Sequence, residues 1–270
     1  MYSLKNKVVV VTGASSGIGK ALADEALHRG AKVAVCARSI DKLKKIYDHD
    51  DSLVHIHEAD VSKAEDCKEF IETVMEKWGG IDVLINNAGI SMRALFEYTD
   101  LKVIEELMNI NFWGTVYCTK HAVTSIKQRK GTIVGVSSIA GYRGLPGRTG
   151  YSASKFAMQG FLESLRTELL HTGANVMWVA PNFTSSNIRN VARSADGSAQ
   201  KETPLDEKKL MSSEECARLI LNAVEQRKRT LVMTAQGKLT VWVNRLFANL
   251  ADKLVYKHFL KEPNSPLADY

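Results

Sequence analysis

Short apolar runs alternate with longer stretches of helical periodicity along most of the chain. The apolar runs are rich in β-branched residues and predict strands at residues 8–11, 32–37, 53–57, 83–85, 132–136, 175–179 and 230–233. Apolar residues spaced three and four apart predict helices at residues 17–29, 40–48, 63–78, 100–127, 151–171 and 213–227. Strands that alternate with helices are typical of a parallel sheet. We therefore expect an α/β fold with one doubly wound parallel sheet and helices on both faces.

Two stretches depart from this alternation. Residues 183–212 are polar and contain Gly197 and Pro204, and a loop this long in a compact domain is usually functional or disordered. Beyond residue 237, apolar residues at helical spacing predict a helix over about 238–260. This stripe consists of Leu239, Trp242, Val243, Leu246, Phe247, Leu250 and Leu254. The chain is thus divided into a main domain (1–236) and a C-terminal helical extension (237–270).

The surface that covers this apolar stripe is not settled by the sequence. Such stripes most often pack on the protein's own core, but an apolar helix outside the minimal fold could instead cover the main cleft. Packing against a second subunit is the next alternative, and we expect a homo-oligomer, either a dimer or a tetramer. Contact with a membrane surface is the least favoured of the three.

Composition and charge narrow the class of protein. The chain has 270 residues, of which 45% are hydrophobic and 24% charged, as in ordinary globular proteins. The net charge of +6 is spread along the chain, and its two small basic clusters, 42–45 and 227–229, have no aromatic residues between them. A nucleic-acid groove usually combines the two, so no nucleic-acid partner is expected.

The cysteines and the N-terminus bear on location. Four scattered cysteines, Cys36, Cys67, Cys118 and Cys216, show neither metal-ligand spacing nor a disulfide framework. No metal site is expected. The first predicted strand begins near residue 7, and no apolar run approaches the length of a membrane span. These features predict a cytoplasmic protein.

A glycine-rich turn joins the first predicted strand to the first helix. Its sequence is Thr12-Gly13-Ala14-Ser15-Ser16-Gly17-Ile18-Gly19. Glycines allow the backbone to approach a pyrophosphate closely, and the start of the following helix presents free N–H groups and a positive dipole end. This strand–turn–helix context predicts a dinucleotide site that includes Gly13, Ser15, Ser16, Gly17, Ile18 and Gly19.

Tyr151 and Lys155 form the most informative pair for chemistry. They are four residues apart on a predicted helix and so share a face, and Ser138 lies thirteen residues upstream of Tyr151. A phenol is a weak acid at neutral pH, but the nearby Lys155 charge is expected to lower the pKa of Tyr151. Tyr151 would then exchange a proton with a substrate oxygen that Ser138 holds by a hydrogen bond.

Taken together, these motifs resemble those of the short-chain dehydrogenases/reductases. The glycine-rich turn, Asn86-Asn87-Ala88-Gly89, Asn111, Ser138, Tyr151 and Lys155 match that family in order and spacing over about residues 5–235. The resemblance implies a Rossmann-like fold and a catalytic set of Asn111, Ser138, Tyr151 and Lys155. In that set Asn111 supports a proton relay, and Lys155 also holds the cofactor ribose beside Tyr151. It further implies that residues 183–212 form a substrate lid.

The residues after the second strand indicate which cofactor is bound. NAD-binding folds usually place an acid there for the ribose hydroxyls, whereas this chain has Ala37 followed by Arg38. A guanidinium can bind a 2′-phosphate bidentately, so NADP is the expected cofactor. Ser16 argues against NADP, because many NADP-preferring relatives have a second basic residue at this position. A solvated strand-end arginine is the alternative for Arg38.

Further cofactor contacts are implied by the resemblance. Asp60 and Val61 would meet the adenine ring, with a turn or helix-cap role as the alternative for Asp60. Asn87 would lie near the adenosine. Thr184 and Ser186 would lie near the nicotinamide, although Asn182 replaces the glycine that relatives usually have before them.

The expected activity is transfer of a hydride between NADP(H) and a carbonyl/alcohol pair. Several largely apolar residues near the expected cleft favour a hydrophobic ketone or secondary alcohol: Met92, Tyr142, Leu145, Pro146 and Phe183. Arg93, Arg143 and Arg148 keep open a 3-oxoacyl carrier reductase that accepts an acidic group. A cofactor-binding sensor or scaffold without turnover is the other alternative, since fold does not fix function.

Overall fold

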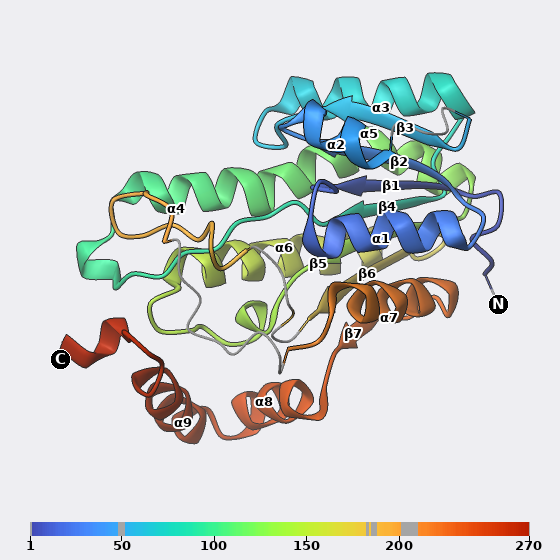
Figure 1. Ribbon diagram of the computed structural model, residues 1–270. Coiled ribbons are helices and arrows are strands. Elements are labelled where there is room, and N and C mark those ends of the chain that lie inside the picture. The colour runs from blue at the N-terminus through green and yellow to red at the C-terminus, as the bar shows by residue number, and fades with distance from the viewer. Residues whose placement is uncertain (1, 48–51, 182–183, 185–187, 201–209, 270) are drawn as a thin grey trace.

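A computed structural model describes residues 2–47, 52–181, 184, 188–200 and 210–269 (Figure 1). Its centre is one sheet of parallel strands in the order β3-β2-β1-β4-β5-β6-β7. The strands are β1 (Val8–Thr12), β2 (Lys32–Ala37), β3 (Val54–Glu58), β4 (Val83–Asn86), β5 (Thr132–Val136), β6 (Asn175–Ala180) and β7 (Thr230–Val232). Each predicted strand is present within one or two residues of its expected ends. The single doubly wound sheet is therefore confirmed.

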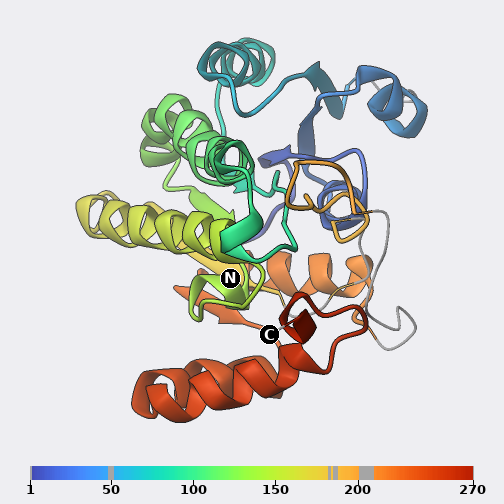
Figure 2. The ribbon, with the colours of Figure 1, turned by 90° about the vertical axis from the view of Figure 1, so that its left-hand side faces the viewer.

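Helices cover both faces of this sheet, as Figure 2 shows in a view turned by 90°. On one face lie α1 (Gly17–His28), α2 (Ile40–Tyr47) and α7 (Ser213–Glu225). The other face carries α3 (Ala64–Trp78), α4 (Leu101–Leu107), α5 (Gly114–Gln128) and α6 (Thr149–Glu168). Because both faces are covered, the central strands are apolar at nearly every position rather than at alternate ones.

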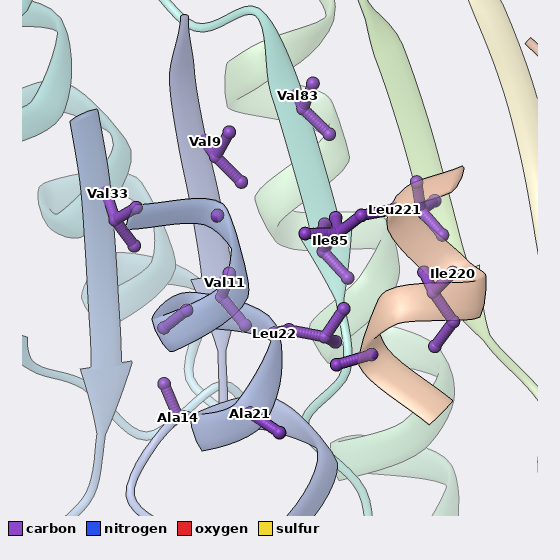
Figure 3. Close-up of a cluster of buried hydrophobic side chains, with 14 of the residues drawn as sticks. Val9, Val11, Ala14, Ala21, Leu22, Val33, Val83, Ile85, Ile220 and Leu221 are labelled. Carbon is purple, nitrogen blue, oxygen red and sulfur yellow. The ribbon is translucent and has the colours of Figure 1, made fainter. Parts of the chain in front are cut away.

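The alternation of side chains along each strand divides the core into two halves. Val9 and Val11 of β1 point toward α1 and α7, where they pack with Leu22 and Leu221 (Figure 3). Val8 and Val10 point to the opposite face, into the half that contains Phe70. Burial of a Val, Leu or Phe side chain stabilises the fold by about 1.5–3 kcal/mol each. These two layers hold the carboxyl ends of the strands rigidly in place.

The long helix expected at residues 100–127 is interrupted. Its first part is α4, its last part is α5, and a π-helical turn, η2 (Met108–Trp113), joins them. Asn111 lies within this turn and is fully buried. A π-turn adds a residue to the helical repeat and usually marks a functional site. Here it directs the Asn111 amide into the protein rather than along the helix.

The C-terminal extension contains two helices, α8 (Ala235–Leu246) and α9 (Ala248–Leu260), rather than the single helix that we predicted. The chain turns at Phe247, whose backbone angles (φ −136°, ψ 61°) lie outside the helical region. Both helices lie at one edge of the molecule, below the sheet in Figure 1. A 3₁₀ turn, η5 (Pro266–Asp269), follows them.

Part of the expected lid, residues 183–212, is bound to the main domain. The Arg193 N–H donates to the Ser91 carbonyl, the Arg93 N–H donates to the Arg193 carbonyl, and both bonds measure 2.9 Å. The Arg193 guanidinium also binds both carboxylate oxygens of Glu106 on α4. Residues 182–183, 185–187 and 201–209 lie outside the described part, so a lid that opens and closes stays a prediction.

Candidate active site

Two adjoining cavities lie at the carboxyl edge of the sheet. One, of about 390 Å³, is enclosed by the glycine-rich turn and the ends of β2 and β3. The other, of about 450 Å³, lies beside Ser138, Tyr151 and Lys155. They share the lining residues Ile18, Asn87, Gly89 and Ile188. A doubly wound sheet binds ligands at this edge, where the strand order reverses between β1 and β4. The first cavity is called the nucleotide cavity below, and the second the catalytic cleft.

The nucleotide cavity collects most of the predicted cofactor residues. Its lining includes Gly13, Ser15, Ser16, Gly17, Ile18, Gly19, Arg38, Asp60, Val61 and Asn87. Gly13 and Gly17 have positive φ angles of 69° and 53°, which favour glycine. A Cβ atom at Gly19 would lie 2.3 Å from the Gly13 carbonyl oxygen. The turn therefore requires glycines in order to bring its backbone to the cavity wall.

Thr12 and Asn87 tie the glycine-rich turn to the loop after β4. The Thr12 hydroxyl accepts hydrogen bonds from the N–H groups of Asn87 and Ala88, each at 3.0 Å. The Asn87 side-chain amide donates to the carbonyls of Thr12 (2.9 Å) and Gly13 (3.3 Å). Asn87 thus acts through the turn as well as lining the cavity. Thr12 was not selected from the sequence, although its place at the end of β1 was a usable signal.

Positive charge gathers at the end of β2. Arg38 is exposed there and lines the nucleotide cavity together with Ser39. Lys42, on the first turn of α2, also lines it. In the sequence, Lys42 was noted only as part of the small basic cluster 42–45. Arg38 lies before α2 begins, so helical spacing does not relate the two residues and no local signal marked Lys42. It supplies a second cation that Ser16 does not.

Asp60 and Val61 take different positions in the same cavity. The Asp60 carboxylate accepts hydrogen bonds from the N–H (3.0 Å) and the hydroxyl (2.8 Å) of Ser62, which forms a local turn. Lys63 occupies the N-cap position of α3 without a side-chain hydrogen bond, so Asp60 has the turn role of the alternative and not the helix-cap role. Val61 is buried, and a Cβ at Gly114 would lie 2.9 Å from it. Both residues line the cavity, as an adenine contact requires.

Ser138, Tyr151 and Lys155 come together in the catalytic cleft from two elements. Ser138 caps the 3₁₀ turn η3 (Ile139–Gly141) after β5, with its hydroxyl accepting the Ala140 N–H at 3.2 Å. Tyr151 lies in the first turn of α6, and Lys155 lies one turn later. The Lys155 Nζ is 5.8 Å from the centre of the Tyr151 ring and donates to the Val136 carbonyl at 2.9 Å.

The pKa of Tyr151 differs from the sequence-based expectation. It is raised above its ordinary value, chiefly because the phenol is buried away from water. A hydrogen bond with Ser138 and the charge of Arg148 lower it, but they do not outweigh burial. The expectation that Lys155 lowers the pKa of Tyr151 is therefore wrong for this structure. The ammonium points to the Val136 carbonyl, and burial lowers its own pKa to about 8.

Asn111 binds the loop that runs between the two cavities. Its amide nitrogen donates to the Ile90 carbonyl (3.0 Å) and to the Ser154 hydroxyl (2.8 Å), and its amide oxygen accepts the Ile90 N–H (2.9 Å). A Cβ at neighbouring Gly89 would lie 2.9 Å from the Asn111 amide oxygen and 3.4 Å from the Lys155 Nζ. Asn111 thus positions the wall beside Lys155, while its part in a proton relay stays a prediction.

The outer wall of the catalytic cleft comes from the C-terminal extension. Leu239 and Val243 of α8 line it, together with Leu254, Val255 and Phe259 of α9. Of the cleft residues expected from the sequence, Leu145 lines it, whereas Met92 is fully buried and Tyr142 accepts a hydrogen bond from the Trp178 indole. Phe183 lies outside the described residues. The sequence identified the apolar stripe of the C-terminal extension, but it left open whether the stripe would line the cleft.

Arginines of the main domain fix this wall in place. Arg148 and Arg93 both contact the buried Glu262 carboxylate, and Arg93 also donates to the Pro263 carbonyl at 2.6 Å. Arg143 pairs with Asp252 on α9. Each of the three arginines considered for an acidic substrate group is thus engaged by the chain's own C-terminal extension. The cleft between them is left mainly apolar.

The residues expected near the nicotinamide are only partly described. Thr184 is buried and lines the catalytic cleft, and its carbonyl accepts a hydrogen bond from the Arg189 guanidinium at 3.1 Å. Ser186 and Asn182 lie outside the described residues, so their predicted contacts with the cofactor stay predictions.

The family and the individual proteins whose sequences resemble this chain agree with one another. The family described as short chain dehydrogenase matches residues 7–197. A Dictyostelium discoideum protein named dehydrogenase/reductase SDR family protein 7-like is 34% identical over 268 residues, which cover 94% of this chain and 82% of that protein. An Arabidopsis thaliana protein, 11-beta-hydroxysteroid dehydrogenase-like 4A, is 35% identical over 252 residues, which cover 92% and 83% of the two chains.

Solved structures show the same architecture. An alcohol dehydrogenase from Thermococcus sibiricus, complexed with 5-hydroxy-NADP, is 27% identical, with a TM-score of 0.72 over 84% of this chain and 95% of that one. A short chain dehydrogenase/reductase from Burkholderia phymatum, in complex with NAD, has a TM-score of 0.82 over 93% and 96% of the two chains. At 20% identity, the second similarity shows the fold alone.

Proposed function

This chain belongs to the short-chain dehydrogenase family of oxidoreductases, and from that premise we propose that it transfers a hydride between NADP(H) and an apolar carbonyl or alcohol substrate. The observation that carries the proposal is the meeting of Ser138, Tyr151 and Lys155 in a cleft that adjoins the nucleotide cavity. A sensor or scaffold has no need of a proton donor at this position.

The residues around the nucleotide cavity fit a dinucleotide with a 2′-phosphate. At Gly19, a Cβ would collide with the Gly13 carbonyl, so glycine is needed for the start of α1 to pack against the turn that lines the cavity. Ser16 caps α1 without a side-chain hydrogen bond, which leaves its first N–H groups to a phosphate. Arg38 and Lys42 supply two cations where NAD-binding folds usually place an acid.

The bound nicotinamide supplies the hydride, and the protein supplies binding, orientation and the proton. Lys155 and Asn87 lie where the two cavities meet and would hold the cofactor there. Because burial raises the pKa of Tyr151, its phenol stays protonated at neutral pH and is ready to protonate a carbonyl oxygen. Ser138, which hydrogen-bonds Tyr151, is placed to hold the same oxygen.

The shape of the catalytic cleft favours an apolar substrate. Its outer wall is made by aliphatic and aromatic residues of α8 and α9. Arg93 and Arg148 share the single carboxylate of Glu262, and Arg143 is paired with Asp252. An acidic acyl carrier would have to displace these internal pairs. The hydroxysteroid dehydrogenase-like name of a relative agrees with a bulky hydrophobic ketone or secondary alcohol.

NADPH oxidation across a panel of carbonyl compounds tests this function. The panel combines hydrophobic cyclic and aromatic ketones with a 3-oxoacyl thioester, and NADP⁺ reduction with the matching alcohols follows the reverse direction. We expect turnover with hydrophobic ketones. Tight NADPH binding without turnover of any member would support the sensor alternative, and selective use of the thioester would support the carrier reductase.

The preference for NADP depends on Arg38 in this proposal. We expect NADPH to bind more tightly than NADH, and Arg38→Asp to reverse the order because an acid repels a 2′-phosphate. Hydrogen bonds to charged groups contribute about 1.5–3 kcal/mol, so NADPH affinity should fall about 10–150-fold. Calorimetric titration of both cofactors measures the ratio. Arg245→Asp on the outer face of α8 is the matched control, and an unchanged ratio in Arg38→Asp would place the phosphate elsewhere.

Cofactor capture should depend on pH through Lys155. Burial lowers its pKa to about 8, so the ammonium is present below that pH and is lost as the pH rises through it. We expect kcat/KM for NADPH, which reports groups of the free enzyme, to decline above about pH 8. The NADPH dissociation constant of Tyr151→Phe should rise over the same pH range, and Tyr151 cannot cause this rise because it is absent there. A flat profile from neutral pH to about pH 9.5 would contradict the assignment.

A further inference from the structure

The outer face of α8 and α9 exposes an unusual amount of apolar surface. Eight of the sixteen large hydrophobic residues that are exposed in the described part of the chain lie on these two helices. Leu239 and Leu254 border the catalytic cleft, and the outer face carries the other six: Trp242, Leu246, Phe247, Leu250, Tyr256 and Leu260. Each of the eight is between 41% and 58% exposed. Single exposed leucines are normal, but a cluster of this kind marks an interaction surface. Packing on the chain's own core, one of the alternatives for the stripe, thus leaves these residues exposed in the described part of the chain.

Helical spacing gathers these residues on a continuous face. Trp242 and Leu246 are four residues apart on α8 and lie opposite the buried Gly237. At the break between the helices, the Trp242 and Phe247 rings are 5.8 Å apart in an edge-to-face arrangement. Leu250 then continues the face onto α9. Figure 1 and Figure 2 both show these two helices at the outer edge of the molecule, away from the sheet.

Positive charges accompany the apolar residues. Five exposed cations, Lys238, Arg245, Lys253, Lys257 and Lys261, lie along the two helices. The acids nearby are already used, since Asp252 pairs with Arg143 and Glu262 is buried against Arg148 and Arg93. The exposed face thus combines a Trp, a Phe and several Leu residues with a clear excess of positive charge. This composition is typical of helices that lie in a membrane interface.

We propose that the α8–α9 face docks on the surface of an anionic lipid membrane. Leu246, Phe247 and Leu250 would enter the boundary between headgroups and acyl chains, and the lysines would reach the anionic headgroups with their long stems along the apolar surface. The helices would lie flat on the membrane. Each is about 12–13 residues long, and in the described ranges no helix has both the length and the apolar character needed to cross a bilayer.

A second copy of this chain is the less suitable occupant of the same face. A twofold contact would place the same surface on both subunits, so the five cations of one would face the five of the other. Like charges brought together across an interface cost several kcal/mol, whereas anionic headgroups complement them. Charge complementarity therefore selects lipid over self-association.

Co-sedimentation of the full chain with vesicles tests the proposal. We expect binding to phosphatidylcholine vesicles that contain about one quarter phosphatidylglycerol, and much weaker binding to pure phosphatidylcholine or at high salt. Leu246→Glu/Leu250→Glu removes two apolar anchors and adds two repelling charges, so partitioning should fall at least about tenfold. Neither residue lines the catalytic cleft, so NADPH binding and thermal unfolding should stay unchanged and report intact folding.

The matched control is Leu101→Glu/Leu170→Glu, which makes the same changes at leucines that are 62% and 67% exposed on other elements. It should keep wild-type vesicle binding. Three outcomes would overturn the proposal: no binding of the wild type to anionic vesicles, equal losses in both double variants, or wild-type binding by Leu246→Glu/Leu250→Glu. A lower molecular mass of Leu246→Glu/Leu250→Glu in light scattering without lipid would also overturn it, because the face would then be a subunit interface.

Discussion

Replacing Tyr151 with phenylalanine should lower the turnover of a true substrate by about 10²–10⁴-fold, the usual contribution of a positioned proton donor. The phenylalanine keeps the ring in the first turn of α6 and removes only the hydroxyl that hydrogen-bonds Ser138. NADPH affinity should change little, because Lys155 keeps its bond to the Val136 carbonyl. Steady-state rates and a fluorescence titration of NADPH measure the two effects separately.

The matched control for this substitution is Tyr47→Phe. Tyr47 is also a buried tyrosine, but its hydroxyl bonds the Lys20 carbonyl at 3.4 Å on α1 and lies away from the catalytic cleft. Its loss should leave turnover within a factor of about three, because no proton donor is removed. If Tyr151→Phe kept wild-type turnover, proton donation by this residue would be ruled out. If Tyr47→Phe lost as much as Tyr151→Phe, the effect would reflect stability and not chemistry.

Replacing Asn111 with leucine should have the second large effect, on stability. Leucine has a similar volume but leaves the buried N–H and carbonyl of Ile90 without their partner. Each unsatisfied buried group costs about 1–3 kcal/mol, so the free energy of unfolding should fall by about 2–6 kcal/mol. Urea unfolding measures this loss. Activity of the folded fraction should also fall, because Gly89 and Lys155 lie next to the Asn111 amide.

Asn109→Leu provides the control in the same π-helical turn. Asn109 is exposed, so the identical substitution two residues away should change the free energy of unfolding by less than about 0.5 kcal/mol. Equal losses in the two variants would show that the turn itself, and not the Asn111 bonds, carries the stability. A stable but inactive Asn111→Leu would instead point to a direct role in proton transfer.

The local sequence pattern was enough to predict the parallel sheet and the glycine-rich turn. A strand that is buried on both faces appears in the sequence as a continuous apolar run. Such a run can be recognised from neighbouring residues alone. Gly13 and Gly17 have positive φ angles because the tight turn requires them, and this requirement also involves only neighbouring residues. Tyr151 and Lys155 were placed together by the helical repeat alone. In each case the information lies within a few positions of the residue concerned.

The local sequence predicted only part of the cofactor site. Arg38 was found because it follows Ala37, which stands where NAD-binding folds usually place an acid, but Lys42 was noted only as part of a small basic cluster. Whether Lys42 faces the cofactor site or the solvent depends on where the first turn of α2 lies relative to the glycine-rich turn. That placement is set by packing of both on β1 and β2, which the local sequence does not encode.

Tertiary structure alone decided the environment of Tyr151 and the role of the C-terminal helices. Burial raises the pKa of Tyr151, although a lysine one turn away predicted the reverse. Desolvation depends on every segment that surrounds a group, and charge on a helix is only one contribution. Glu262 meets Arg93 across 169 residues of sequence, and this pairing turns α9 toward the cleft. Helical periodicity identified an apolar face, but a periodic pattern carries no information about its partner. Only the folded chain showed which of these residues line the cleft and which remain exposed.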